Sequence, residues 1–410
     1  MSGPLDGVRV LDLSRILAAP FAAQLLGDLG ADVIKVERPG TGDDARQYGP
    51  PFLDNPGGDE PGGAESGFYL STNRNKRSIT IDHSSPAGAG LIGELAAVSD
   101  VLVENYRRGV LDKYGLGYEA LSAVNPRLVY CSVTGFGQDG PYADRAGYDG
   151  VFQAMSGLMS VSGVPDGQPG AGPMKVGVSM VDILTGLYAS SAILAALRHR
   201  DVVSGRGELI DLALLDCGVA ALSHYAENYL VSGVAAPRRG NGGFGGIPSQ
   251  AFRCTDGEIF LVASTPKQWS ALATAVERPE LADDPQFATV SARIANRDLV
   301  LQTLESIFAE RSVAHWVTTL EAVDVPVSPV NAMDAVFANP QVRHRGLRTT
   351  VRHQTAGPVD LIANPIRYPA GAATTYTAPP LLGQHTDEIL TDVLGKTPDE
   401  IARLRASGAI

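Results

Sequence analysis

The segment at 135–150, with the sequence GFGQDGPYADRAGYDG, holds the residues best suited to chemistry. Its five glycines allow the backbone to approach a ligand closely, because glycine has no Cβ and tolerates positive φ. Asp149 stands near its end, directly before the apolar-rich residues 151–159. A carboxylate in this place has two interpretations. It either caps the N-terminus of a helix or acts as a nucleophile.

A second glycine-rich run lies at 240–246. The Lys-Ser/Thr pair that completes a P-loop is missing, so the run does not indicate ATP binding. It is either a flexible connector or a loop whose backbone N–H groups face developing negative charge. The glycines concerned are Gly242, Gly243, Gly245 and Gly246.

Positive charge is concentrated in two short stretches, 73–77 (NRNKR) and 106–108 (YRR). Each lies close to a predicted strand, and ligands of α/β proteins bind at strand ends. The two stretches therefore indicate either an anion-binding site or two solvated surface patches. Arg238 and Arg239, which precede the glycine run, leave the same choice between binding a carboxylate and lying on the surface.

The composition excludes several classes of protein. The formal net charge of −12 provides no basic footprint for nucleic acid. With 44% hydrophobic and 19% charged residues, the chain is typical of a soluble protein, and no apolar run approaches the roughly 20 residues that cross a bilayer. The N-terminal residues do not resemble a secretory signal, and three distant cysteines predict no disulfides, so we expect a cytoplasmic protein. The seven histidines are scattered, so no metal site is predicted.

The elements that must position these residues alternate between strand and helix. Strands are predicted at 8–13, 31–37, 77–82, 100–104 and 128–133, and helices at 18–29, 86–98, 118–123 and 181–200. This alternation predicts a doubly wound α/β domain with a parallel sheet. The turn at 14–18 contains no Gly-x-Gly-x-x-Gly, so a nicotinamide cofactor is not expected. Farther along, a helix is predicted at 219–231, and a smaller α+β unit is predicted from a hairpin at 250–263 and helices at 268–276 and 293–308.

Motifs along nearly the whole chain, taken together and in order, resemble the class III coenzyme A transferases (CaiB/BaiF type). The motifs are VLDL at 10–13, AP at 19–20, LGADVIKVERPG at 29–40, GD at 42–43, NKRS at 75–78, VENY at 103–106, the 135–150 segment and PLLGQHT at 380–386. In that family the aspartate after Gly-Tyr, here Asp149, is the expected covalent catalyst.

The resemblance implies a fold and an assembly. A large, doubly wound (Rossmann-like) α/β domain would be formed by both chain ends and a smaller α+β domain by the middle, and two copies would form an interlocked homodimer. The expected boundaries are 1–215 for the large domain with the catalytic aspartate, 216–325 for a linker and the small domain, and 326–410 for the return linker and the C-terminal part of the large domain.

The resemblance also implies an activity. Coenzyme A would pass from an acyl-CoA donor, with succinyl-CoA as one candidate, to a carboxylic acid acceptor through an aspartyl anhydride and an aspartyl–CoA thioester. Coenzyme A would be substrate and product, with no tightly bound cofactor and no metal. The glycine run at 242–246 would be a lid or oxyanion loop, and its Phe244 departs from the four-glycine form of oxalate enzymes.

By the same resemblance, six residues are expected around coenzyme A: Arg38, Lys76, Arg77, Asn105, Arg108 and Lys113. Apart from the resemblance, three residues are candidates for binding the acceptor acid: Tyr148, Arg238 and Arg239. The two arginines favour a dicarboxylate acceptor, because a guanidinium binds a carboxylate with matched geometry.

Two alternatives stay open. The superfamily also contains 2-methylacyl-CoA racemases, which move an α-proton with a histidine and an aspartate. The histidine position corresponds to Tyr148, which suits acid–base work near neutral pH poorly. Asp182 either matches the racemase aspartate or begins the helix predicted at 181–200. The second alternative is a protein that binds coenzyme A without catalysis.

Overall fold

The computed structural model describes residues 3–53, 65–243, 245–368 and 375–410. The chain forms two compact units. The first comprises Met1–Leu158, Val176–Val234 and Arg345–Ile410, and the second Met159–Lys175 and Ala235–His344. Both chain ends therefore lie in the first unit. The boundaries differ from those predicted at 215/216 and 325/326, because the segment Met159–Lys175 belongs to the second unit and the chain returns to the first only at Arg345.

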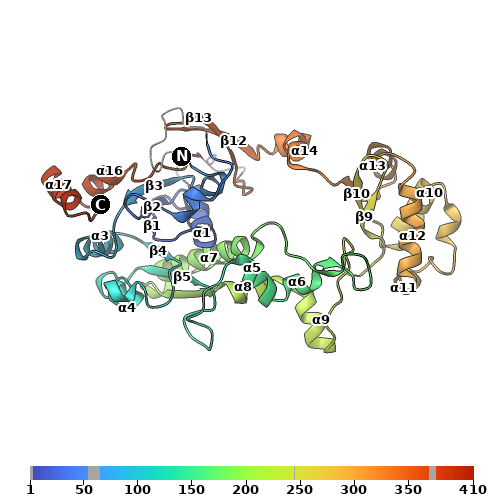
Figure 1. The fold of residues 1–410 in the computed structure, drawn as a ribbon, viewed down its shortest axis with the longest axis horizontal. Coiled ribbons are helices and arrows are strands. Elements are labelled where there is room, and N and C mark those ends of the chain that lie inside the picture. Colours follow the sequence, from blue (N-terminus) through green and yellow to red (C-terminus); the bar gives the residue numbers. More distant parts are fainter. Residues whose placement is uncertain (1–2, 54–64, 244, 369–374) are drawn as a thin grey trace. The chain divides into compact units, whose positions relative to one another are not determined.

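The first unit is built on a parallel sheet (Figure 1). Among the described residues the sheet has six strands in the order β3-β2-β1-β4-β5-β8. They are β1 (Arg9–Asp12), β2 (Asp32–Glu37), β3 (Lys76–Thr80), β4 (Val101–Glu104), β5 (Val129–Thr134) and β8 (Leu209–Ala213). Every neighbouring pair is parallel. The predicted parallel sheet is confirmed, with β8 as a strand that the sequence analysis did not predict.

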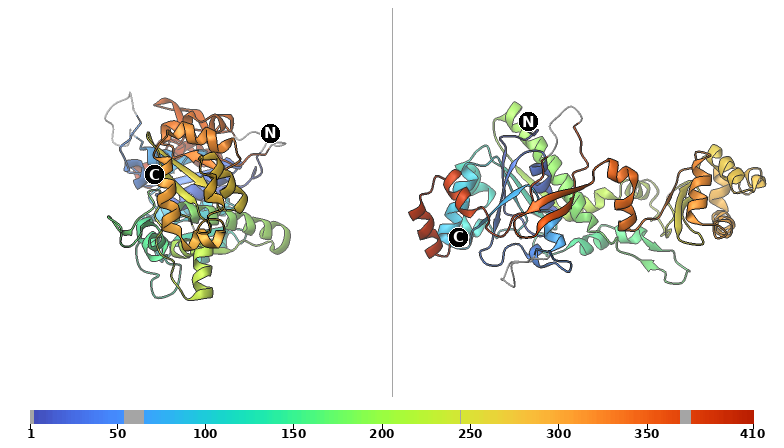
Figure 2. Two further views of the ribbon diagram at one scale, coloured as in Figure 1. Left: turned by 90° about the vertical axis from the view of Figure 1, so that its right-hand side faces the viewer. Right: turned by 90° about the horizontal axis from the view of Figure 1, so that it is seen from above.

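Helices cover both faces of this sheet. Alternate strand residues such as Val10 and Leu11 point to opposite faces, as the two-residue period of a strand requires. One face packs against α1 (Ala18–Asp28) and α7 (Met180–His199). The other packs against α3 (Pro86–Ala97), α4 (Tyr118–Val124), α16 (Thr386–Asp392) and α17 (Pro398–Ala406). The C-terminal helices α16 and α17 lie beside α3 in both Figure 1 and Figure 2.

The remaining elements of the first unit are short. They are η1 (Asp44–Gln47), α2 (Gly67–Leu70), η2 (Asp112–Tyr114), α5 (Asp149–Met155), η3 (Arg200–Ser204), α8 (Leu214–Ala221), α9 (His224–Ser232), β12 (Arg348–His353) and β13 (Gly357–Ile362). The single helix predicted at 219–231 is wrong. Ser223 has a φ of 45°, which breaks the segment into α8 and α9.

The second unit pairs a small antiparallel sheet with helices. Its sheet has the order β11-β10-β9, formed by β9 (Ser249–Arg253), β10 (Glu258–Val262) and β11 (Val327–Pro329). A two-stranded ribbon consists of β6 (Gly163–Val164) and β7 (Gly172–Pro173). Its helices are α10 (Pro266–Ala275), η4 (Pro279–Ala282), α11 (Val290–Ala295), α12 (Arg297–Phe308), α13 (Val313–Glu321), α14 (Met333–Ala338) and α15 (Pro340–His344), while α6 (Leu158–Val161) begins at the junction of the two units.

The helix predicted at 293–308 is divided in the structure. Asn296 ends α11, because its side-chain amide donates to the carbonyls of Ala292 and Gln286 at 3.0 and 3.2 Å. The helix then restarts as α12.

One helix in the described part of the chain, Met180–Ser204, is long and apolar enough to cross a membrane by length and composition alone. Its residues Val181, Ala189 and Ile193 are fully buried in the core formed with α1 and the sheet. Core helices of globular proteins pass the same test, so this is weak evidence for a membrane span.

Candidate active site

A cleft opens at the point where the strand order of the sheet reverses. The chain runs outward from β1 through β2 to β3, and in the other direction from β4 through β5 to β8. In such sheets, ligands bind at the carboxyl ends of the strands beside this switch point. A cleft of about 240 Å³ lies there, lined by residues 15–18 after β1, 105–108 after β4, the 143–148 part of the glycine-rich segment, and Asp182.

Asp149, the expected nucleophile, does not line this cleft. It is the first residue of α5 and is 5% exposed. Its Oδ1 accepts the backbone N–H groups of Val181 at 2.9 Å and Asp182 at 3.4 Å, and its Oδ2 accepts the side-chain amide of Gln153 at 2.7 Å. The carboxylate therefore caps the N-terminus of α7. Asp149 therefore caps a helix, as one of its two interpretations predicted. The helix that it caps is α7, and not α5, which Asp149 begins.

Asp182 lines the cleft in its place. It is half-buried in the first turn of α7, a helix of 20 residues, where the exposed backbone N–H groups favour negative charge. In the sequence, Asp182 has two interpretations, a racemase aspartate or the start of a helix, and neither makes it a nucleophile. The signal that pointed to it was an acidic residue in the first turn of the longest predicted helix.

Four arginines line the same cleft: Arg15, Arg107, Arg108 and Arg145. Arg15 forms an ion pair with Asp44 at 3.2 Å, and Arg108 lies 3.8 Å from Asp144. The guanidinium of Arg145 stacks over the ring of Tyr142 at 3.8 Å. The prediction named Arg108 alone of these four. The site is strongly cationic although the whole chain is acidic.

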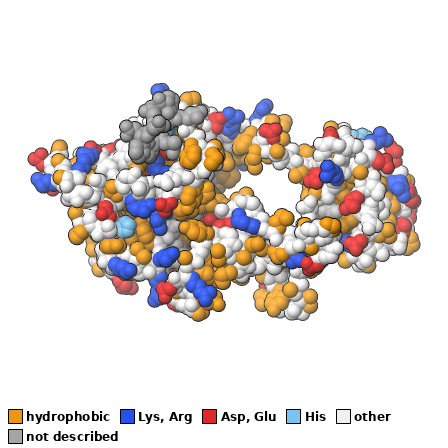
Figure 3. Space-filling view, in the orientation of Figure 1, with side chains coloured by type: hydrophobic (Ala, Val, Ile, Leu, Met, Phe, Trp, Pro, Cys, Tyr) orange, Lys and Arg blue, Asp and Glu red, His pale blue; other side chains and the backbone are white. Residues whose placement is uncertain are grey.

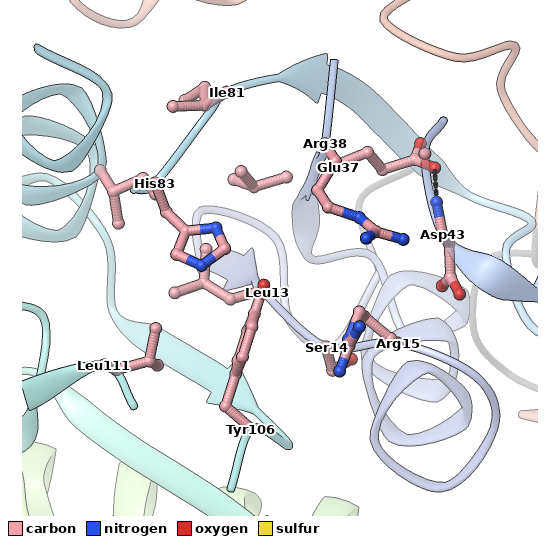
Figure 4. Close-up of a pocket in the computed structure, with 13 residues that line it drawn as sticks. Leu13, Ser14, Arg15, Glu37, Arg38, Asp43, Ile81, His83, Tyr106 and Leu111 are labelled. Carbon is pink, nitrogen blue, oxygen red and sulfur yellow. Dashed lines mark hydrogen bonds between the residues drawn. The ribbon is translucent and has the colours of Figure 1, made fainter. Parts of the chain in front are cut away.

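A smaller recess adjoins the cleft through residues shared by both, Arg15 and Tyr106. Figure 4 shows the side chains of His83, Tyr106 and Arg38 around it. The rings of His83 and Tyr106 meet edge to face at 5.2 Å, and Arg15 lies 5.1 Å from the Tyr106 ring. Burial lowers the pKa of His83, so its ring is neutral near pH 7. The recess has a volume of about 10 Å³, so a purine would contact these aromatic rings and the two arginines at its mouth and not inside it.

Two predicted residues support this region directly. Arg38 is exposed at the recess and pairs with Asp44 at 2.6 Å. Asn105 donates to the Arg15 carbonyl at 2.7 Å and accepts the Arg15 N–H at 2.8 Å, so it fixes the segment after β1. Lys113 is exposed on η2.

Lys76 and Arg77 are not placed for the role predicted for them. The ammonium of Lys76 is fully buried and bonds to Asp12 at 2.8 Å. Arg77 bonds to Asp32 at the start of β2 and to Glu388 of α16. Both cations are used in ion pairs that hold the sheet and the C-terminal helices together, so we remove them from the coenzyme A site.

The predicted glycine run and its two arginines belong to the second unit. The N–H of Gly242 donates to the Arg239 carbonyl at 2.9 Å, and that of Gly243 to the Ser249 carbonyl at 2.8 Å. These two N–H groups are therefore unavailable as oxyanion donors, which corrects that part of the prediction. Gly245 has a φ of 94°, a conformation that requires glycine, while Gly246 cannot carry a side chain because a Cβ there would lie 2.4 Å from the Ser264 Cβ.

Arg238 is also engaged within the second unit. Its Nε donates to the Val164 carbonyl at 3.0 Å, and its guanidinium forms an ion pair with Asp166. Arg239 is half-buried. Phe244, the departure from the four-glycine form, lies outside the described residues.

The described residues of the cleft supply only one member of the racemase pair, because they include Asp182 but no histidine. Tyr148 lines it and is 69% exposed, and none of the described residues lining it is a histidine. Across the described residues there is no group of three histidine, cysteine or acidic side chains that could hold a metal ion. A carboxylate in a cationic cleft of about 240 Å³, without a histidine among the described lining residues, fits an acyl-group or CoA-group transfer enzyme better than a racemase.

Residues 5–386 match the family described as CoA-transferase family III, and the chain belongs to that family. It is a CoA-transferase, as the resemblance predicted.

Relatives of known name support this assignment. The chain is 44% identical to the succinyl-CoA:glutarate CoA-transferase of Homo sapiens, over 99% of this chain and 90% of the relative. It is 42% identical to the succinate–glutarate CoA-transferase of Agrobacterium fabrum, over 95% and 96% of the two chains. A crystal structure of a CaiB/BaiF family protein from Brucella suis is 41% identical, with a TM-score of 0.85, and covers 96% of this chain and 100% of its own.

Proposed function

We propose that the protein transfers coenzyme A from succinyl-CoA to a dicarboxylic acid, with Asp182 as the nucleophile in place of Asp149. The observation that carries this proposal is the position of Asp182 in the cleft at the switch point of the sheet. The named relatives support succinyl-CoA as donor and glutarate as the first acceptor to test. The arginines of the cleft supply positive charge for a second carboxylate on either acid.

Coenzyme A would lie across the cleft and its recess. The ring of Tyr106 and the neutral ring of His83 would contact the adenine, and Arg15 and Arg38 would bind phosphates. The pantetheine arm would then run along the cleft toward Asp182. The N-terminus of α7 would favour the anionic form of the nucleophile.

The transfer would proceed in two matched halves. A carboxylate oxygen of Asp182 attacks the thioester carbonyl, the C–S bond breaks, and a mixed anhydride and the coenzyme A thiolate result. The thiolate attacks the aspartyl carbonyl, which releases succinate and leaves an aspartyl–CoA thioester. The acceptor carboxylate attacks this thioester to form a second anhydride, and the thiolate then attacks the acceptor's carbonyl. The product is the new acyl-CoA and a regenerated carboxylate.

Asp182→Ala and Asp149→Ala distinguish the two aspartates. The wild-type protein is incubated with succinyl-CoA and no acceptor, and mass spectrometry of its peptides locates the coenzyme A adduct. We expect the adduct on Asp182, and turnover of Asp182→Ala lower by roughly a thousandfold or more. An adduct on Asp149 would restore the original assignment. In D₂O, deuterium gained at the α-carbon of a 2-methylacyl-CoA without acyl exchange would support the racemase.

We also propose that the protein is an interlocked homodimer, as its family resemblance implies. Large apolar side chains are exposed on two helices of the first unit, among them Leu187 and Tyr188 on α7 and Leu230 and Val231 on α9. Figure 3 shows hydrophobic side chains gathered on α9. Exposed apolar clusters of this kind mark interaction surfaces, and a second copy is the partner that the proposal requires.

A further inference from the structure

Glu104 connects the two segments that form the proposed coenzyme A site. It is the last residue of β4 and is 5% exposed. Its Oε2 accepts the backbone N–H of Tyr106 at 2.8 Å, and its carboxyl is also hydrogen-bonded to Ser132 of β5. The Ser132 hydroxyl accepts from the side-chain amide of Gln138 at 2.8 Å, so Ser132 links Gln138 to Glu104.

This relay joins two loops with separate tasks. Tyr106 belongs to the segment 105–108, which lines the cleft, and Tyr106 itself also lines the recess. Gln138 belongs to the glycine-rich segment 135–150, whose later part forms the other wall of the cleft. The Glu104 carboxyl lies between them and makes no contact with the cleft itself, since it is absent from the cleft lining.

Glu104 lines a second cavity, which has a volume of about 170 Å³. Ser132 and Gln138 line the same cavity. Arg107 and Arg108 of the 105–108 segment line this cavity as well. Charged and titratable groups face this space from the same loop, from η2, from α4 and from β5. These groups are Arg107, Arg108, Asp112, Tyr118, Glu119 and Tyr130, with Cys131 behind them on β5.

These surroundings leave Glu104 sensitive to pH near neutrality. Burial raises the pKa of Glu104 to about 7, and the nearby carboxylate of Asp112 adds to the increase. The hydrogen bonds from Ser132 and from the Tyr106 N–H act in the opposite direction. The ionised carboxylate accepts both bonds at once. The protonated form carries a hydrogen on one oxygen and cannot accept both bonds in the same way.

We propose that Glu104 is a positioning residue for coenzyme A, whose ionised carboxylate holds Tyr106 and the 105–108 segment in the binding conformation and whose protonation releases them. This inference rests on the proposed coenzyme A site. It predicts an affinity that follows the ionised fraction of one buried carboxyl.

The expected size of the effect follows from that fraction. If only the ionised form is competent, the apparent Kd equals the intrinsic Kd divided by the competent fraction. With a pKa of about 7, that fraction falls roughly tenfold between pH 8 and pH 6. The Kd for coenzyme A should therefore rise by about the same factor.

The experiment is isothermal titration calorimetry of the full-length protein with coenzyme A from pH 6 to pH 8, on the wild type, Glu104→Gln and Ser132→Ala. Protonation of coenzyme A itself is common to all three proteins, so differences between them isolate Glu104. Glu104→Gln should lose the roughly tenfold pH dependence. Ser132→Ala should keep it but move its midpoint to higher pH, because the Ser132 hydrogen bond lowers the pKa of Glu104.

A purely structural role for Glu104 would change the Kd equally at every pH. The proposal is overturned if Glu104→Gln keeps the wild-type pH dependence, or if Ser132→Ala leaves the midpoint unchanged. If the wild type binds no coenzyme A at any pH, the proposed coenzyme A site is wrong. That result differs from a failure of the Glu104 proposal, in which the wild type binds coenzyme A.

Discussion

The backbone N–H of Asp182 donates to the carboxylate of Asp149 at 3.4 Å. The two aspartates are therefore parts of one structure with different tasks. Asp149 is buried and fixes the first turn of α7, while Asp182 projects from that turn into the cleft. The proposed assignment follows from this difference, because a carboxylate buried with three hydrogen bonds is less accessible to a thioester than one that lines the cleft.

The capping role of Asp149 predicts a loss of stability in Asp149→Ala. The variant leaves the N–H groups of Val181 and Asp182 and the Gln153 amide without their acceptor. We expect the free energy of unfolding to fall by about 2 kcal/mol. Denaturant unfolding measures this, and Asp182→Ala is the matched control, expected to change stability by less. Equal losses in the two variants would contradict the capping assignment.

The buried pair of Lys76 and Asp12 predicts a structural role for both residues. Lys76→Met leaves the carboxylate of Asp12 without its cation inside the sheet, which typically costs about 3–5 kcal/mol. The double variant Asp12→Asn with Lys76→Met should recover most of that loss, because no charge is then left unpaired. Chemical denaturation of the two variants gives the comparison.

The same substitution tests the corrected coenzyme A site. Folded Lys76→Met should bind coenzyme A with a Kd within about threefold of the wild type, measured by calorimetry at a temperature where the variant is folded. A loss of a hundredfold or more would return Lys76 to the site.

Glu104 also predicts a pH-dependent stability. Because burial raises its pKa in the native protein to about 7 from an ordinary value of 4.5, the native state binds more protons than the unfolded state between these pH values. Stability from this group therefore falls as the pH rises through that window. Above pH 7 the buried carboxyl is ionised, and its full cost lowers the free energy of unfolding by about 3 kcal/mol relative to acidic pH.

Glu104→Gln cannot ionise and should escape the penalty. Its free energy of unfolding relative to the wild type should increase by about 3 kcal/mol between pH 4.5 and pH 8. Urea unfolding at a series of pH values would measure this. A constant difference across the series would show that the buried carboxyl does not titrate in this window.

The apolar surface of α9 predicts the assembly. Leu230→Asp with Val231→Asp places two charges on side chains that are 74% and 81% exposed. If this surface is a dimer contact, light scattering should show a dimer for the wild type and monomers or aggregates for the variant. Val124→Asp, on a valine of α4 that is 62% exposed, is the matched control and should remain dimeric. A monomeric wild type would contradict the dimer.

The sequence by itself determined the class of fold and the family. Buried apolar strands alternating with helices specify a parallel sheet, because only crossover connections join parallel strands. Five of the six strands were predicted, and the family motifs identified a CoA-transferase without reference to coordinates. The strand β8 was missed because Asp211 interrupts its apolar residues, and four of its five residues alternate between exposed and half-buried, so no continuous apolar run marks it.

Only the tertiary structure decided which charged residues form the site. Lys76 and Arg108 look alike in sequence, but the fold buries Lys76 against Asp12 and leaves Arg108 in the cleft. Asp149 and Asp182 are 33 residues apart, and their roles follow from the helix terminus that brings them together. A charged side chain that is buried against an opposite charge stabilises the fold, and one without such a partner can contact a substrate. The fold decides between these roles because the partners come from distant parts of the chain.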